Sequence, residues 1–339
     1  MFFPDADPYQ VWRWLHERDL LTVRTGYHSF PQIKGQELDD YKTWTKTIKA
    51  GQGDDMLKFV GAGENLCWAS YDYEIFRDER PDIDRDAEEV QTQVMTVLGE
   101  NGWPFRQHIT YEETGDRLLK VYEDVAKGAG LTPGWFIDHV ETFSERNLER
   151  IAKLGGGIAL QNRLQFQAED FAARYGAEAL KKTPNFRAIL DLGVPVGGGT
   201  DATRVTSYNP WLSIQWMATG LSRGGMRMYD DDNLLTRDQP EATAVALTGG
   251  LIEAVGGDRD LLTLKAADTV TIDLGGRRVI PGLIDSHTHI IRQGNNFAME
   301  LRWDHVPSLA DGLRMLKAQA ERTPAGQWIR VVGGWSADQ

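Results

Sequence analysis

The chain has 339 residues, of which 41% are hydrophobic and 26% are charged. This balance is typical of a globular protein with one large domain or two smaller ones. The formal net charge is −13, and an acidic chain repels phosphate backbones, so a nucleic-acid partner is not expected. No stretch reaches the ~20 apolar residues of a membrane span, so a membrane partner is not expected either.

The cysteine content and the N-terminus bear on the compartment. Cys67 is the only cysteine in the sequence, which excludes an intrachain disulfide bond and suits a reducing compartment. Residues 1–19 have neither the basic region nor the apolar core of a signal peptide. Together these features favour a cytoplasmic location.

Most of the chain predicts strands that alternate with helices. The helical patterns cover 7–18, 88–102, 113–130, 144–155 and 308–322. The strand patterns cover 20–30, 56–63, 103–110, 134–141, 156–163, 194–203, 282–290 and 327–335. Ser144 stands at the expected N-cap of one helix, and the polar stretch 77–90 is expected to be a surface loop. Such alternation predicts a parallel sheet with crossover helices.

Residues 240–280 have a different pattern. Two β-rich stretches with Gly-Gly turns follow one another there. This pattern predicts a small antiparallel, β-sandwich-like unit beside the main fold.

Two histidines, His287 and His289, stand two positions apart after an apolar segment. Because alternate side chains of a strand point to the same face, both imidazoles can bind one metal ion. The alternative is a pair of unrelated surface histidines.

Three further residues are predicted at strand ends. His108 and His139 are 31 positions apart, which matches the ~31 residues per unit of an eight-unit barrel of ~250 residues. Asp201 follows His139 by 62 positions, with one predicted strand between, so we expect it two strands further round. Alternatively, the histidines are structural, and Asp201 is the N-cap of the next helix.

All five residues fall at the carboxyl ends of predicted strands, where barrel enzymes carry their catalytic groups. Four imidazoles and a carboxylate suit zinc or a similar divalent ion. We therefore predict a (β/α)8 TIM-type barrel with one or two divalent metal ions, zinc being the expected metal.

The same segments resemble the amidohydrolase superfamily, most closely the amidohydrolase-3 group that includes YtcJ-like proteins. That superfamily carries a His-x-His pair on the first strand, single histidines on the fifth and sixth, and an aspartate on the eighth. The resemblance is carried by VIPGLIDSHTHI, ELRWDHVPSLADGLRML, FIDHVETFSERNLERIAKLGGGIALQNR and GGTDATRVTSYNPW. It implies a metal-dependent hydrolase that cleaves non-peptide carbon–nitrogen bonds in a small-molecule amide.

The resemblance also implies roles for individual residues. His287, His289, His108 and His139 would be metal ligands. Asp201 would be a metal ligand and the general base, which activates the hydrolytic water and then protonates the leaving amine.

Many members carry a carboxylated lysine that bridges two metal ions, and Lys58 is the matching position. The Asp-Gly that usually follows reads Ala62-Gly63 here, and Glu64 is an alternative oxygen ligand. Three positions after Asp201 are candidates for substrate binding by their place alone: Arg204, Asn209 and Trp211.

The order of the segments departs from the family. The His-x-His segment follows Asp201 instead of preceding it, so the chain resembles a permuted and incomplete member with a join near 237–240. The expected parts are 1–237 for the later barrel strands, 240–280 for the small β unit, and 281–339 for the first barrel strand. Missing strands would leave open edges, which a homo-oligomer can cover.

Three functions remain open on the sequence alone. The first is amide hydrolysis, the second is a non-catalytic rearranged fragment that binds metal or assembles as an oligomer, and the third is ester, lactone or phosphoester hydrolysis on the same fold. The distance between the His287/His289 pair and the His108/His139/Asp201 set separates the first two.

Overall fold

The chain divides into two compact units. The computed structural model describes residues 9–73, 76, 79–80, 82–202, 206–235, 243–275, 277, 282–289, 300–303 and 306–332. The larger unit comprises Met1–Leu235 and Ile284–Gln339, and the smaller one Thr236–Leu283. None of the described helices is long and apolar enough to cross a membrane.

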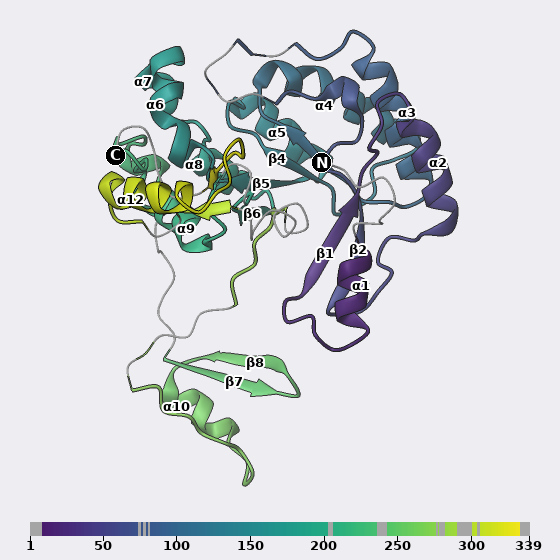
Figure 1. Ribbon diagram of the computed structural model, residues 1–339. Helices are drawn as coiled ribbons and strands as arrows, with labels where there is room; N and C mark the ends of the chain where they lie inside the picture. The colour runs from purple at the N-terminus through teal and green to yellow at the C-terminus, as the bar shows by residue number, and fades with distance from the viewer. Residues whose placement is uncertain are drawn as a thin grey trace. The chain divides into compact units, whose positions relative to one another are not determined.

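The strands of the larger unit pair in parallel (Figure 1). They are β1 (Thr25–Ser29), β2 (Leu57–Ala62), β3 (Arg106–Ile109), β4 (Phe136–His139), β5 (Gly157–Gln161), β6 (Val196–Gly199), β9 (Glu300–Arg302) and β10 (Arg330–Val332). β1 pairs with β2, β3 to β6 form one sheet in chain order, and β9 pairs with β10. A parallel bridge between Ala62 and Phe105 links β2 to β3.

The His-x-His segment extends this arrangement on the far side of β6. The backbone N–H of Asp201 donates to the carbonyl of His287 at 2.8 Å, and that of His289 donates to the carbonyl of Ala202 at 2.8 Å. A parallel bridge joins Ala202 and Thr288. The segment therefore lies beside the strand that leads to Asp201, although 86 positions separate Asp201 from His287.

Helices connect the parallel strands. They are α1 (Gln10–His16), α2 (Glu37–Thr47), α3 (Ala87–Glu100), α4 (Glu112–Lys127), α5 (Glu145–Leu154), α6 (Leu164–Tyr175), α7 (Ala177–Leu180), α8 (Phe186–Asp191), α9 (Pro210–Thr219) and α12 (Leu309–Ala320), with short 3-10 turns at η1 (Trp68–Ser70) and η2 (Asp231–Asn233). α2 to α5 pack in succession outside the strands (Figure 1).

The hydrogen bonds of β3 show which of its faces meets these helices. Gln107 accepts hydrogen bonds from Gln91 of α3 and Tyr122 of α4, each at 2.6 Å. Because side chains alternate along a strand, Arg106 and His108 point to the opposite, inner side. Strand alternation thus puts the Arg106 cation and His108 together on the inner face of the sheet.

Buried aromatic rings fill the layer between strands and helices. The rings of Phe105 and Trp135 stack with centroids 5.6 Å apart, and Tyr122 meets Trp135 edge-on at 5.4 Å. A Cβ atom on Gly156 would lie 2.2 Å from the Trp135 ring. Glycine is therefore required where the chain enters β5.

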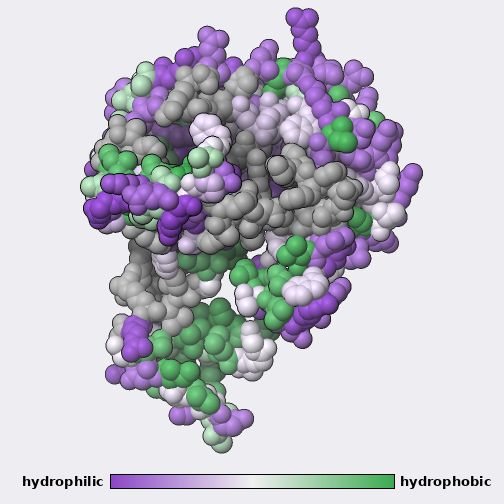
Figure 2. Space-filling view, in the orientation of Figure 1, coloured by the Kyte–Doolittle hydropathy of each residue, from purple (hydrophilic) through white to green (hydrophobic). Residues whose placement is uncertain are grey.

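The smaller unit is a hairpin followed by a short helix. β7 (Ala244–Thr248) and β8 (Leu251–Gly256) pair antiparallel, and α10 (Asp258–Leu261) and η3 (Leu262–Leu264) follow. Gly249 and Gly250 both have positive φ, 58° and 81°, as a tight hairpin turn requires. Apolar side chains gather on this unit (Figure 2), including Leu251 at 74% and Ile252 at 63% exposure.

The β/α alternation and the parallel pairing confirm the coarse fold prediction. The strand pairs of the described residues do not close into a ring, as an incomplete barrel would show. In the smaller unit the described residues 269–275 contain no strand, so its described part is a hairpin, and the sandwich-like unit stays a prediction. Ser144 does occupy the N-cap position of α5, but its hydroxyl donates to Glu112 at 2.5 Å rather than capping the helix.

Candidate metal centre

Six side chains meet at the carboxyl ends of the parallel strands of the larger unit. They are Glu64 after β2, His108 on β3, His139 at the end of β4, Asp201 after β6, and His287 and His289 on the segment beside β6. Five of them were predicted as a set from the sequence, and Glu64 as an alternative. The structure brings the His-x-His pair to the other ligand candidates despite the altered chain order.

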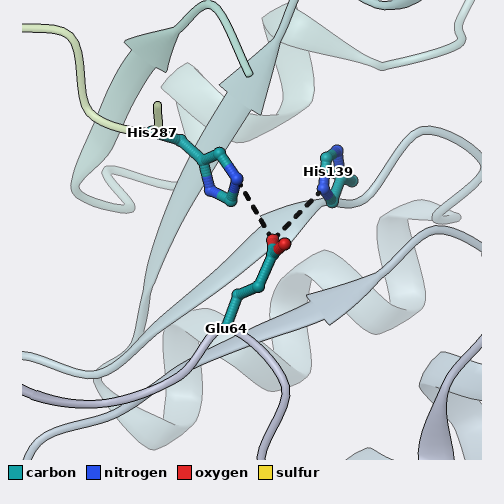
Figure 3. A group of neighbouring side chains, drawn as sticks. All are labelled: Glu64, His139 and His287. Atoms are coloured by element: carbon teal, nitrogen blue, oxygen red, sulfur yellow. Dashed lines mark ion pairs between the residues drawn. The ribbon is translucent and has the colours of Figure 1, made fainter. Parts of the chain in front are cut away.

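Glu64 lies at the middle of this group. Its Oε2 atom is 3.1 Å from His287 Nε2, 3.7 Å from His139 Nε2 and 3.7 Å from His108 Nδ1. Figure 3 shows its carboxylate between the imidazoles of His139 and His287. One carboxylate thus faces three rings from three different segments.

Asp201 closes the other side of the group. Its Oδ1 atom is 3.0 Å from His289 Nε2 and 3.6 Å from His287 Nε2. Two sets of possible metal-binding atoms result, one from Glu64, His139 and His287 and one from Asp201, His287 and His289, each with its atoms within 4.8 Å of one another. His287 belongs to both.

The backbone takes unusual conformations where two of these side chains are presented. His139, Val140 and Asp201 have φ values of 83°, 50° and 52°, a left-handed region that costs a non-glycine residue about 1–3 kcal/mol and is frequent at functional sites. Regular alternation would send Asp138 and His139 to opposite faces. Asp138 pairs with His108 and shares its face, and it contacts His287. The turn at His139 therefore brings the His139 side chain to the same side, where it faces Glu64.

Three of the histidines have a second carboxylate on the ring nitrogen that faces away from the group. The pairs are His108 Nε2 with Asp72 at 3.3 Å, His287 Nδ1 with Asp138 at 3.0 Å, and His139 Nδ1 with Glu141 at 3.7 Å. Carboxylates in this position orient metal-binding histidines and fix their tautomers.

Sequence reasoning missed these supporting groups. Asp138 and Glu141 flank His139 in the segment FIDHVE, and Arg106 precedes His108 by two positions. The strand alternation that paired His287 with His289 also puts Arg106 on the face of His108. No comparable signal marks Asp72, which lies outside any strand.

Opposite charges keep this buried group ionised. Burial by itself raises the pKa of Glu64, but the charge of His287 together with the neighbouring His108, His139 and His289 holds the pKa well below its usual range. Burial likewise raises the pKa of Asp201, while the contact with His289 and neighbouring charge lower it to about 2. For His139 burial lowers the pKa, and two neighbouring carboxylates raise it to about 10.

Unpaired buried atoms show that the residues fit a metal ion. Among the described residues, Glu64 Oε2, His108 Nδ1 and His139 Nε2 are buried without a hydrogen-bond partner. An unsatisfied buried polar atom costs about 1–3 kcal/mol, and a cation bound by these atoms removes that cost. Imidazole nitrogen and carboxylate oxygen are ligands of zinc.

Lys58, the expected bridging lysine, is not part of this group. It is exposed near the start of β2, between the buried side chains of Leu57 and Phe59. It stands six positions before Glu64, whereas the group forms beyond the end of β2. The structure therefore does not place Lys58 with the other candidates, and Glu64 from the same segment is the carboxylate that joins the group.

Two of the candidate substrate residues, Asn209 and Trp211, do not join the group either. Asn209 caps α9, since its side-chain oxygen accepts a hydrogen bond from the backbone N–H of Trp211 at 3.1 Å. The Trp211 side chain is 54% exposed. Arg204 lies outside the described residues.

Comparison with known families identifies relatives of this site. The family model described as the amidohydrolase family matches residues 4–251 and 270–339. The N-substituted formamide deformylase of Arthrobacter pascens is 29% identical over 92 residues, which are 27% of this chain and 17% of that protein. Imidazolonepropionase of Pseudomonas putida is 47% identical over 55 residues, 16% and 13% of the two chains. The chain thus spans less than a fifth of these curated relatives.

A solved structure supports the fold. An uncharacterized metal-dependent hydrolase from Pyrococcus horikoshii aligns with a TM-score of 0.50 and 18% identity, over 66% of this chain and 45% of that one. At this identity the likeness concerns the fold alone.

The charge state of His139 predicts how the metal-free protein responds to pH. Its pKa is raised from 6.5 to about 10 on folding, so its stabilising charge is fully present below pH 6.5 and is lost as the pH rises through about 10. We expect the unfolding free energy of metal-free protein to fall over this interval and to fall less in His139→Asn. Denaturant titrations at several pH values measure this, and equal slopes in both proteins would contradict it.

The placement of Glu64 and Lys58 predicts opposite effects on metal binding. Glu64→Gln removes the central anionic ligand, so we expect zinc affinity to fall by at least the about 10–100-fold that loss of an outer partner causes. Lys58→Ala, on the exposed face of β2, should bind zinc as the wild type does. Elemental analysis after dialysis against graded chelator measures both, and the reverse ranking would show that the lysine is the ligand.

Proposed function

Because the chain belongs to the amidohydrolase family, we propose that it is a metal-dependent hydrolase that cleaves a non-peptide carbon–nitrogen bond in a small-molecule amide. The observation that carries this proposal is the convergence of the His287/His289 pair on Glu64, His139 and Asp201. A rearranged fragment without activity would have no reason to keep these groups in contact.

The ligand arrangement supports a site for two divalent ions, with zinc favoured by the donor set. The two oxygens of Glu64 face different histidines: Oε1 is 3.5 Å from His289 Nε2, and Oε2 is 3.7 Å from both His108 and His139. Glu64 would therefore help to hold the metal together with the histidines on either side of it. An imidazole nitrogen has one lone pair, so His287 Nε2 would serve only one of the two ions.

Tyr73 fixes the orientation of Glu64. Its hydroxyl donates to Glu64 Oε1 at 2.8 Å, and its ring centroid lies 3.9 Å from that of His108. The carboxylate is therefore held from one side by a phenol while its other oxygen faces the rings. Such preorganisation lowers the cost of assembling the site around an ion.

The chain's own residues then supply proton transfer. A bound zinc ion lowers the pKa of a water molecule toward about 7 and polarises a substrate carbonyl. Asp201, whose low pKa keeps it ionised, has its Oδ1 atom at the edge of the group beside His289. We infer that Oδ1 accepts the proton of the attacking water and returns it to the leaving amine.

Replacing Asp201 tests this role. Asp201→Asn keeps the shape of the side chain but removes its ability to accept a proton, so we expect turnover to fall about 10²–10⁴-fold. Asp124→Asn, at an exposed aspartate paired with Lys120 and Lys127, is the matched control and should keep wild-type turnover. Turnover is measured on a panel of N-acyl and N-formyl amines as the rate at which the free amine is released.

The same panel separates the alternatives. Wild-type protein that binds zinc but cleaves only esters, lactones or phosphoesters would replace the amide assignment. Wild-type protein that binds no zinc or manganese after incubation would contradict the proposed function as a whole.

A further inference from the structure

A buried ion pair lies directly behind His287. Arg106 Nε donates to Asp138 Oδ2 at 3.1 Å, and Arg106 Nη2 donates to Asp138 Oδ1. The Asp138 side chain is fully buried and that of Arg106 is 17% exposed. Arg106 Nη1 also donates to the backbone carbonyl of Ser286, so the pair joins β3 and β4 to the His-x-His segment.

One atom of His287 faces both members of this pair. Its Nδ1 is 3.0 Å from Asp138 Oδ1 and 3.3 Å from Arg106 Nη2. An ionised aspartate can only accept a hydrogen bond, and an arginine can only donate one. Asp138 and Arg106 therefore make opposite demands on the same nitrogen.

These demands decide whether His287 can bind a metal ion. A neutral imidazole has one N–H group and one lone pair. If Nδ1 carries the proton, it donates to Asp138, and the lone pair of Nε2 faces Glu64 and Asp201. If Nδ1 accepts from Arg106, Nε2 carries the proton and has no lone pair for a ligand bond.

We propose that Asp138 is a positioning residue that selects the metal-binding tautomer of His287 against the competing donor Arg106. The shorter of the two contacts to Nδ1 is that of Asp138, and Asp138 also occupies two nitrogens of Arg106 that would otherwise be free to donate. The inference rests on the proposed metal site and adds a residue that determines whether that site can form.

The neighbouring histidine provides an internal comparison. Glu141 stands behind His139 and accepts hydrogen bonds from Arg163 Nε at 3.0 Å and Nη2 at 2.7 Å. Among the described residues, however, neither ring nitrogen of His139 has a hydrogen-bond partner. Loss of Glu141 would thus leave Arg163 without its carboxylate, as loss of Asp138 would leave Arg106. Unlike Arg106 at His287, however, Arg163 makes no hydrogen bond to the ring of His139.

The test is the zinc affinity of four proteins, measured by competition with a chromophoric chelator. Asp138→Asn should weaken zinc binding about 10–100-fold, the range for loss of an outer-shell partner. Glu141→Gln, which also deprives a buried arginine of its carboxylate, should weaken it less. Adding Arg106→Met to Asp138→Asn removes the competing donor and should restore part of the affinity.

Two results would overturn the proposal. One is an unchanged affinity in Asp138→Asn while the wild type binds zinc. The other is an equal loss in Asp138→Asn and Glu141→Gln that Arg106→Met does not relieve. If the wild type itself binds no zinc, the proposed metal site has failed instead.

A second pair of variants covers the case in which Asp138→Asn alone does not fold. Arg106→Met and its combination with Asp138→Asn both lack the buried guanidinium. With the competitor gone, their zinc affinities should differ by much less than about tenfold, and a difference of about tenfold or more would overturn the proposal.

Discussion

Three backbone hydrogen bonds between β6 with the residues after it and the His-x-His segment hold the candidate site together. They run from Ser286 to Gly198, from Asp201 to His287 and from His289 to Ala202. They fix the positions of the two histidines relative to Asp201, which stands 86 positions before His287 in the chain. The first and last strands of a closed barrel are neighbours, so this pairing keeps the family's spatial order although the chain order differs.

Charge is the second constraint on the site. Ionised carboxylates and histidines are buried together here, and several of their atoms have no hydrogen-bond partner among the described residues. Burying charge is unfavourable unless it is paired or bound to a metal. The arginines behind Asp138 and Glu141 compensate part of the negative charge, and the inner oxygen of Glu64 is left facing imidazoles. A bound divalent cation would compensate the negative charge that remains.

The sequence predicted the parts of the fold that depend on local pattern. Alternating helices and strands, and the strand-end positions of His108 and His139, follow from periodicity and spacing. The region that contains α6 to α8 was not assigned, and α2 was missed, because short amphipathic segments owe their helicity to packing rather than to intrinsic propensity. Which strands pair with one another depends on long-range contacts, which no local pattern encodes.

In the candidate site, too, some features follow from local sequence pattern and others only from the fold. Lys58 and Glu64 are six positions apart in the sequence, an even spacing that strand alternation cannot separate. Lys58 lies near the start of β2 and Glu64 beyond its end, where the other candidate ligands gather. The supporting residues Asp72 and Arg106 act through contacts with distant segments, so their roles emerge only from the folded chain. The permuted order of segments remains a prediction from the sequence, whereas the contact between the two sets of candidate ligands is seen only in the folded chain.

Anomalous X-ray diffraction at the zinc edge from crystals grown with zinc tests the central claim most directly. We expect two anomalous peaks, one beside Glu64, His139 and His287 and one beside Asp201 and His289. A zinc-loaded crystal in which the His287 segment lies away from Glu64, or in which the peaks lie elsewhere, would contradict the proposed site.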